Sequence, residues 1–329
     1  MTTRLFSALL LFVLFTAGVS SAADITGLLM GAVLDPPSGG VRLILGIPGA
    51  ATLGAPVPLG IDTSRAALSA RLDYVLAAAS DDGRMVLIHN LSGAPTPAAG
   101  LDVAPSADRI VLSPDGSSAA LLYASQNRVN VITGLPDSPA LGAELDLSGL
   151  PETPSSIAVS DDGQAVVAVA GDSVVAFGPG GGMNTAAFAK RAVVAFLHRS
   201  SDVVITDSDS NSVFLIRDIN GAAELAFVAR NTDAIASPVA IQISRDNQTL
   251  IVANSASGVA ARFNLAGGDP VLAACDCQIS GLEALRDSRT FLLNKLGSGP
   301  LWSFDPDAPN GGIRFVPAPV AVPAEGGQQ

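Results

Sequence analysis

The chain has 329 residues and a formal net charge of −12 at pH 7. Hydrophobic residues make up 48% of it and charged residues only 15%, a composition that can bury a large core and excludes global disorder. The acidic balance and the singly scattered arginines form no basic stripe, so we expect neither nucleic acid nor an anionic membrane surface as a partner.

The first 23 residues have the pattern of a secretory signal peptide. Arg4 precedes an apolar run over residues 5–18, and small residues follow at 19–23. A basic start, a short apolar stretch and a small-residue cleavage site define such signals, and the run is shorter than the ~20 residues that span a bilayer. We expect cleavage after Ala22 or Ala23 in a bacterial-type cell. The mature protein is then periplasmic, secreted or at the cell surface, without a membrane span.

Short apolar runs separated by turn residues follow in chain order. Strands are expected at 25–34, 41–47, 57–62, 73–79 and 85–89, with 48–56 as a loop. Five better-formed units come next, each with three strands and two polar turns, at 109–132, 156–177, 193–216, 238–263 and 282–304. No segment after residue 23 shows sustained helical periodicity, so the chain is expected to be all-β.

The five units repeat at a spacing that predicts the architecture. Their first turns end at Gly116, Gly163, Ser201, Asn247 and Ser288, which are 38 to 47 residues apart. Four-stranded propeller blades repeat every ~40–45 residues. The chain beyond residue 23 gives about 44 residues per blade for seven blades, against about 51 for six and about 38 for eight. We predict a seven-bladed β-propeller over 24–316, with six or eight blades as the alternatives.

The two ends of the propeller carry further expectations. Pairing of the N-terminal strands with residues 313–316 would close the ring and protect its edges. Residues 317–329 are rich in Pro, Ala and Gly and are expected to form a disordered tail. We expect a monomer.

Residues 204–218, Val-Ile-Thr-Asp-Ser-Asp-Ser-Asn-Ser-Val-Phe-Leu-Ile-Arg-Asp, resemble the repeat of the YVTN class of β-propellers. Both run through a strand, a small polar turn with Asn, a second strand and an aspartate. The Ser-Pro-Asp-Gly turn at 113–116 and the Ser-Asp-Asp-Gly turn at 160–163 are similar to turns of bacterial YVTN, WD40-like and lactonase-like propellers. The resemblance covers about residues 70 to 305. It implies an exported or cell-surface propeller that binds something, with enzymes such as lactonases in the minority.

One turn within this stretch opens like a calcium loop. Asp207, Asp209 and Asn211 match the D-x-D-x-N start and Asp218 falls at the twelfth position, but Ser212 replaces the loop's glycine. The later ligand positions also fall in an expected strand. These residues are the only metal candidates, and a solvated turn is favoured over a metal site.

Three other patterns favour structural roles. Asp115 and Asp162, with Asp82 in a related turn, recur in successive units, which favours turn chemistry over catalysis. The glycine-rich segment 178–182 lacks the Lys-Ser/Thr pair and the following helix of a phosphate-binding loop. Trp302 and Phe304 are expected in the core.

Cysteine and histidine define no site. Cys275 and Cys277 leave a local disulfide and a pair of reduced thiols as open alternatives. His89 and His198 adjoin no recognisable nucleophile. No catalytic residue or cofactor is predicted.

The sequence favours a non-enzymatic scaffold that binds a protein or small ligand at the propeller funnel. A lactonase-like hydrolase is the first alternative, and it requires polar side chains from different blades to converge in the central channel. A structural cell-surface protein is the second alternative. A scaffold predicts small and apolar residues in the channel.

Overall fold

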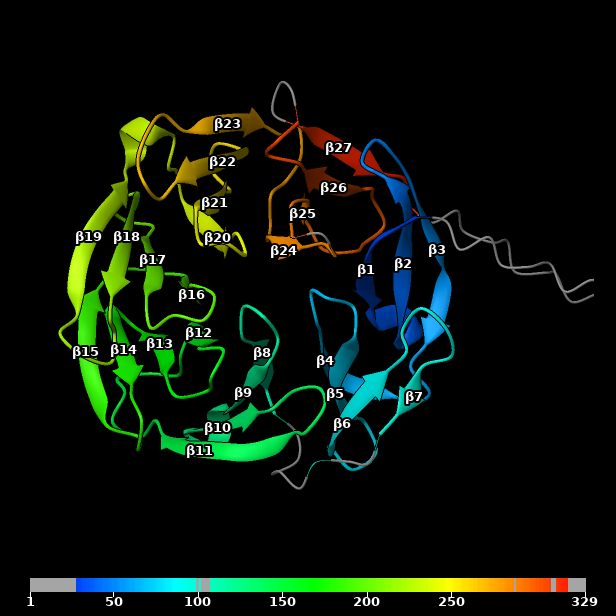
Figure 1. Cartoon of the computed structure of the whole chain (residues 1–329), viewed down its shortest axis with the longest axis horizontal. Helices are drawn as coiled ribbons and strands as arrows, with labels where there is room; N and C mark the ends of the chain where they lie inside the picture. Colours follow the sequence, from blue (N-terminus) through cyan, green and yellow to red (C-terminus); the bar gives the residue numbers. More distant parts are fainter. Residues whose placement is uncertain (1–27, 99–100, 102–106, 287, 309–311, 319–329) are drawn as a thin grey trace, which may run out of the picture.

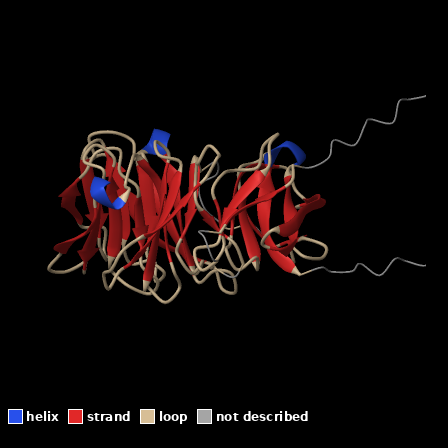
Figure 2. Ribbon diagram, turned by 90° about the horizontal axis from the view of Figure 1, so that it is seen from above, coloured by secondary structure: helices blue, strands red, loops and turns tan. Residues whose placement is uncertain are grey.

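The computed structural model describes residues 28–98, 101, 107–286, 288–308 and 312–318. They form seven antiparallel sheets arranged in a ring (Figure 1). Seen from the side, the strands lie within a flat disc, and loops cover its two faces (Figure 2). The fold is the predicted seven-bladed β-propeller. The expected signal peptide at 1–23 lies outside the described residues, as does the expected tail from residue 319 onwards.

Each blade is one contiguous stretch of chain, and consecutive strands are hydrogen-bonded neighbours. From the innermost strand outwards, the blades are as follows: blade 1, β1 (Leu29–Asp35), β2 (Gly40–Ile47) and β3 (Ala50–Pro58); blade 2, β4 (Thr63–Leu68), β5 (Tyr74–Ala79), β6 (Met85–His89) and β7 (Thr96–Pro97); blade 3, β8 (Arg109–Leu112), β9 (Ser118–Tyr123), β10 (Arg128–Thr133) and β11 (Ala140–Asp146); blade 4, β12 (Ser156–Val159), β13 (Val166–Ala170), β14 (Ser173–Phe177) and β15 (Met183–Phe188); blade 5, β16 (Val194–Phe196), β17 (Val203–Asp207), β18 (Ser212–Arg217) and β19 (Glu224–Ala229); blade 6, β20 (Pro238–Ile243), β21 (Thr249–Asn254), β22 (Val259–Asn264) and β23 (Val271–Ala274); and blade 7, β24 (Glu283–Ala284), β25 (Phe291–Leu292), β26 (Leu301–Phe304) and β27 (Ile313–Val316). Three short 3-10 turns, η1 (Pro36–Ser38), η2 (Ala124–Gln126) and η3 (Asn231–Asp233), lie in connections.

The second strand of a blade is apolar on both sides because neighbouring blades cover both of its faces. Every residue of β5, β9 and β13 is buried. By contrast, the outermost strands β11 and β15 are mostly exposed. A strand covered on both faces reads as a continuous apolar run, which explains why the second strands were the clearest signals in the sequence.

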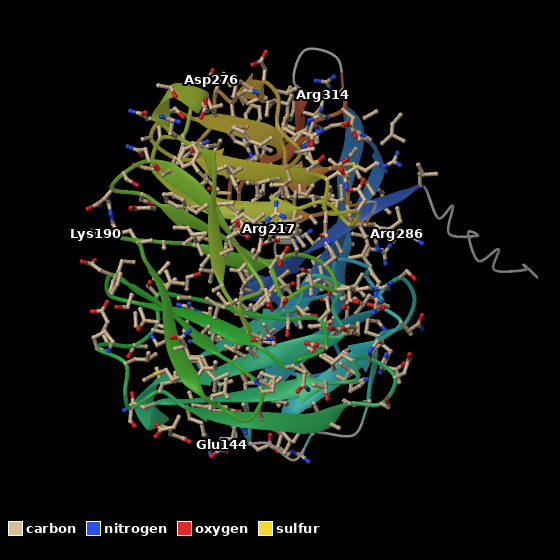
Figure 3. All side chains as sticks on the ribbon, turned by 60° about the vertical axis from the view of Figure 1, so that its left-hand side comes forward. Glu144, Lys190, Arg217, Asp276, Arg286 and Arg314 are labelled. Atoms are coloured by element: carbon tan, nitrogen blue, oxygen red, sulfur yellow. A yellow bond between two sulfur atoms is a disulfide. The ribbon has the colours of Figure 1, made fainter. Side chains whose placement is uncertain are left out.

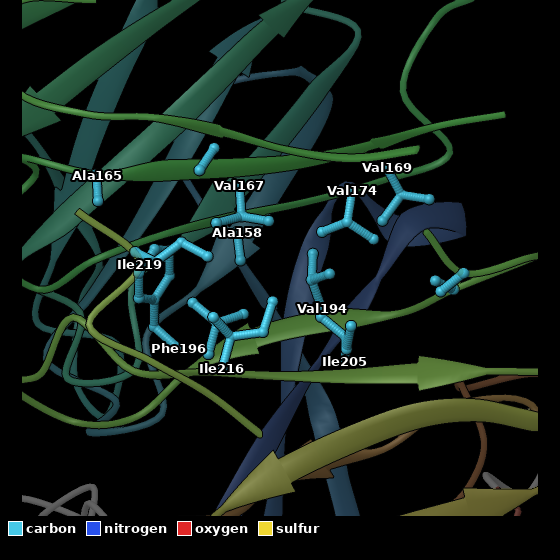
Figure 4. Packing of buried hydrophobic residues seen from close by; sticks show 14 residues of the cluster. Ala158, Ala165, Val167, Val169, Val174, Val194, Phe196, Ile205, Ile216 and Ile219 are labelled. Carbon is cyan, nitrogen blue, oxygen red and sulfur yellow. The ribbon is translucent and has the colours of Figure 1, made fainter. Parts of the chain in front are cut away.

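A hydrophobic cluster fills each of the seven seams between blades. In the seam between blades 4 and 5, Val167 and Val174 belong to the same cluster as Phe196, Ile205 and Ile216 (Figure 4). Fully burying one such side chain contributes about 1.5–3 kcal/mol relative to leaving it exposed. The seams therefore hold the ring together.

The residues aligned at the first turns of blades 3, 4, 6 and 7 have positive φ, whereas in blade 5 the positive φ falls at Arg199 and not at Ser201. Gly116 and Gly163 have φ of 74° and 68°, and Asn247 and Ser288 have φ of 57° and 53°. Each donates its N–H to the carbonyl three residues earlier. Blade 2 has the same turn, closed by Leu72 at φ 60°, which the sequence did not reveal because leucine rarely adopts this conformation.

The predicted closure of the ring is wrong. β27 pairs with β26, and the N-terminal strands form a separate three-stranded sheet. Blades 7 and 1 instead meet through side chains, in a cluster that includes Met30, Leu285 and Leu301. The N–H of Arg286 also donates to the Met30 carbonyl at 3.2 Å. Apolar packing provides this closure without exchange of a strand.

Two further expectations in the first blades are wrong. The range 48–56, expected to be a loop, contains most of β3, whose small residues pair with β2. The strand expected at 57–62 is only the end of β3, and the next strand, β4, begins at Thr63. The turn at 80–83 joins β5 to β6, as expected.

Many charged side chains lie on the outside of the ring. Glu144 on β11, Lys190 after β15 and Arg217 on β18 are exposed (Figure 3). Solvent screens charges in such positions, so the acidic surplus costs the fold little. In the described ranges, no helix has the length and apolar character needed to cross a bilayer.

Candidate functional site

The innermost strands of the seven blades surround a central channel that contains a cavity of about 650 Å³. Each of these strands contributes two or three consecutive residues to its wall. Small-molecule sites in proteins have volumes of about 300–1,000 Å³. The channel is therefore the candidate functional site.

Blades 2 to 7 can be aligned on a backbone hydrogen bond at each first turn. In each, one residue donates its N–H to the carbonyl five places on, as Ser113 does to Ser118 and Ser244 to Thr249. The wall position two residues before the donor is occupied in turn by Ala67, Val111, Ala158, Ala195, Gln242 and Glu283. Blade 1 contributes Ala32, Val33 and Leu34. This level of the wall is small and aliphatic except at blades 6 and 7.

Three polar side chains of the wall, Gln242, Glu283 and Lys295, come from blades 6 and 7, and Ser69, Ser113, His198 and Ser288 also line the channel. The Gln242 amide donates to the Leu282 carbonyl at 3.3 Å, which links blade 6 to blade 7. The Glu283 side chain is accessible from the channel, but it lies among protein atoms that displace much of the water around its carboxyl group. Burial raises the pKa of its carboxyl group, and the charge of Lys295 opposes that rise. Sequence reasoning missed these residues because their shared level in the wall appears only when the blades are aligned.

A second polar cluster joins blades 3, 4 and 5 at their first turns. The buried Asp161 accepts hydrogen bonds from the backbone N–H of Asp115 at 2.8 Å and of Arg199 at 2.7 Å. Burial is the main cause that raises the Asp161 pKa. Burial also opposes ionisation of Asp115, but hydrogen bonds from Ser117 and from Asp161 outweigh it and lower the Asp115 pKa. The pKa of Asp161 is therefore raised and that of Asp115 lowered, which makes Asp161 the more readily protonated of the two.

Similar hydrogen bonds connect other blades at these turns. The Tyr74 hydroxyl donates to the Gly116 carbonyl at 2.7 Å. The N–H of His198 donates to the Asn247 side-chain oxygen at 2.9 Å, and the Asn247 amide donates to the His198 carbonyl at 2.9 Å. His198 also lines the channel, and its Nδ1 is buried with no hydrogen-bond partner among the described residues, whereas His89 is not part of the wall. These contacts are structural links between blades.

The metal candidates bind protein donors. Asp207 accepts hydrogen bonds from the N–H groups of Asp209 and Ser210 and from the Ser210 hydroxyl, and Asn211 accepts one from the Ser237 N–H in blade 6. Burial opposes ionisation of Asp207, but these hydrogen bonds outweigh it and lower its pKa. Asp209 pairs with Arg191. The arrangement is a turn that also joins two blades.

The repeated turn aspartates bind their own turns. Asp115, Asp162 and Asp82 each accept a hydrogen bond from the N–H two residues later. This is the role that their repetition predicted. In the glycine-rich segment 178–182, the Gly178 N–H donates to the Gly182 carbonyl.

The remaining sequence candidates lie in blades 6 and 7. Cys275 and Cys277 are joined through their sulfur atoms, with 5.0 Å between their Cα atoms. The disulfide in the exported protein stays a prediction. Phe304 is fully buried as expected, whereas Trp302 is half-buried against Phe315.

Comparison with known proteins supports the fold. No family model matches the chain, and neither does any curated protein. Among solved structures, a functionally unknown protein from Desulfotomaculum acetoxidans aligns over 88% of this chain and 99% of its own at 15% identity and a TM-score of 0.58. The virginiamycin B lyase of Staphylococcus aureus aligns over 78% and 84% at 14% identity and a TM-score of 0.54. A candidate 6-phosphogluconolactonase from Bacteroides uniformis aligns over 87% and 94% at 13% identity and a TM-score of 0.55. Likeness at such identity indicates a shared propeller fold and no shared chemistry.

Proposed function

We propose that this protein is an exported, non-enzymatic binding module that holds a small apolar ligand in the central channel. The observation that supports the proposal is the channel wall, where blades 1 to 5 present mostly aliphatic side chains, together with Phe196, to a cavity of about 650 Å³. Removing apolar surface from water contributes about 25 cal/mol per Å². A ligand with an apolar body therefore gains free energy by entering the channel.

The two rival functions fit the wall less well. A hydrolase needs polar side chains that converge from several blades. Apart from His198 of blade 5 and the side chains of Ser69, Ser113 and Ser288, the polar wall residues are Gln242, Glu283 and Lys295, which come from two adjacent blades. Within the described ranges, no three His, Cys, Asp or Glu residues are grouped so that they could hold a metal ion. A purely structural surface protein gives no reason for a polar sector in an otherwise aliphatic channel.

Export is part of the proposal because the first 23 residues carry the pattern of a signal peptide. The N-terminal sequence of protein recovered outside the cytoplasm tests it. A first residue at Ala23 or Asp24 supports export, and an intact N-terminus contradicts it.

Binding of the uncharged fluorophore N-phenyl-1-naphthylamine tests the channel. The matched variant is Ala67→Phe combined with Ala195→Phe, because the equivalent position in blade 7 accommodates the long side chain of Glu283. We expect saturable binding to the natural protein and at least a tenfold loss in the variant, which corresponds to about 1.4 kcal/mol.

The control is Ala140→Phe, which adds the same side chain at an exposed position on the outermost strand β11. It should bind the fluorophore as the natural protein does. Equal binding by all three proteins, or no saturable binding to the natural protein, contradicts the proposal.

A further inference from the structure

The channel wall breaks its own pattern at two neighbouring positions. Around blades 2 to 7, one level of the wall carries alanine or valine four times, followed by Gln242 in blade 6 and Glu283 in blade 7. Placing a carboxylate among protein atoms costs free energy unless a partner compensates. Residues that break a local structural rule are expected where a protein binds or reacts.

The polar groups of this sector retain unused capacity for hydrogen bonds and ion pairs. Gln242 uses its amide N–H₂ on the Leu282 carbonyl, and no described residue donates to its oxygen. In the described part of the chain, Glu283 accepts no hydrogen bond and forms no ion pair within 4 Å. Lys295 is near enough to act on the Glu283 carboxyl electrostatically but does not contact it. The sector therefore offers two acceptors and one cation to a ligand.

We propose that the channel binds small zwitterions with an apolar side chain, the chemical class of the apolar α-amino acids. This inference rests on the proposed function. The ligand's ammonium group binds Glu283 and the Gln242 oxygen, and its carboxylate binds Lys295. Its side chain contacts the aliphatic wall of blades 1 to 5.

The charges of the sector favour a zwitterion over simpler ligands. An amine without a carboxylate can pair with Glu283 but meets the like charge of Lys295. A carboxylate without an amine can pair with Lys295 but meets Glu283. Only a ligand with both charges is complementary to both side chains, and charge-assisted hydrogen bonds of this kind are stronger than neutral ones.

Calorimetric titration of the mature protein with three compounds of similar shape tests the inference. The compounds are L-phenylalanine, 2-phenylethylamine and 3-phenylpropionate. We expect L-phenylalanine to bind at least tenfold more tightly than either of the other two. Equal affinity for all three compounds, or tighter binding of the amine or the acid, contradicts the proposal that the ligand is a zwitterion.

Two variants identify the anchoring residues, and a third serves as control. Glu283→Gln and Lys295→Gln should each weaken L-phenylalanine binding at least tenfold while retaining a cooperative melting transition. Glu144→Gln makes the same change on the exposed face of β11 and should leave the affinity unchanged. Unchanged affinity in both Glu283→Gln and Lys295→Gln contradicts the assignment.

The outcomes separate this inference from the proposed function. If N-phenyl-1-naphthylamine binds in the channel and L-phenylalanine does not, the proposal of a zwitterionic ligand is wrong and the proposal of an apolar binding site is retained. If neither compound binds, the proposed function itself is wrong.

Discussion

Two carboxyl groups with raised pKa values lie in the same ring, and their surroundings differ. Asp161, in the stretch formed by blades 3 to 5, is buried and accepts two backbone hydrogen bonds from neighbouring blades. Glu283, in the stretch formed by blades 6, 7 and 1, is exposed to the channel and accepts none among the described residues. Burial is the leading cause of the shift in both.

The difference shows that a raised pKa does not by itself mark a functional residue. The partners of the carboxyl group decide its role. Asp161 is satisfied by its own protein and links three blades, so it contributes to stability. Glu283 has no hydrogen-bond or ion-pair partner among the described residues and lies at the edge of an apolar cavity, so it is available to a ligand.

The largest expected effect separates Asp161 from its neighbour in the same turn. Asp161→Ala leaves the N–H groups of Asp115 and Arg199 without their acceptor and should lower the free energy of unfolding by about 2–3 kcal/mol. Asp162→Ala removes only contacts within the turn and should cost about 0.5–1 kcal/mol. Urea denaturation measures both values. Equal losses contradict the role of Asp161 as a link between blades.

A middle-sized effect is expected where blade 1 meets blade 7. A Cβ at Gly31 would lie 2.5 Å from Cδ2 of the buried Leu285, so Gly31→Ala forces the side chains of this seam to shift. We expect a loss of about 1 kcal/mol. Gly297→Ala meets no atom within 4 Å and should change stability by less than about 0.5 kcal/mol. Denaturation curves that coincide for the two variants contradict closure of the ring by tight packing at this seam.

The smallest effect should have the opposite sign. The folded-state pKa of Glu283 is raised above the ordinary value of 4.5, so its contribution to stability is favourable below that value and is lost as pH rises through the folded-state pKa. Glu283→Gln should therefore raise the melting temperature at pH 8 by about 1 °C and leave it unchanged at pH 4. Lys295 and His198 are the other titratable groups of the channel wall. A lower melting temperature at pH 8 contradicts an unpaired Glu283.

Much of the fold could be predicted from the sequence because the second strands are covered on both faces. Their continuous apolar runs and the turn residues between them predicted the blades and their number. The strand β3 was missed because its small residues and prolines resemble a loop. The closure of the ring was missed because packing between Met30 and Leu285 depends on residues far apart in the chain.

The candidate site was less predictable. Repeated turns correctly identified Asp115 and Asp162 as turn residues, but nothing in the sequence distinguished Asp161 from Asp162. Gln242 and Glu283 become neighbours only when two blades are placed side by side. Aligning the first turns and comparing the residues two places before them would have revealed both positions.

Crystallography with a brominated ligand tests the central claim most directly. Crystals of the mature protein grown with 4-bromo-L-phenylalanine can be measured at the bromine absorption edge. We predict one anomalous peak inside the channel, with the ligand's ammonium group beside Glu283 and its carboxylate beside Lys295. An empty channel, or a peak only on the outer strands, would contradict the account.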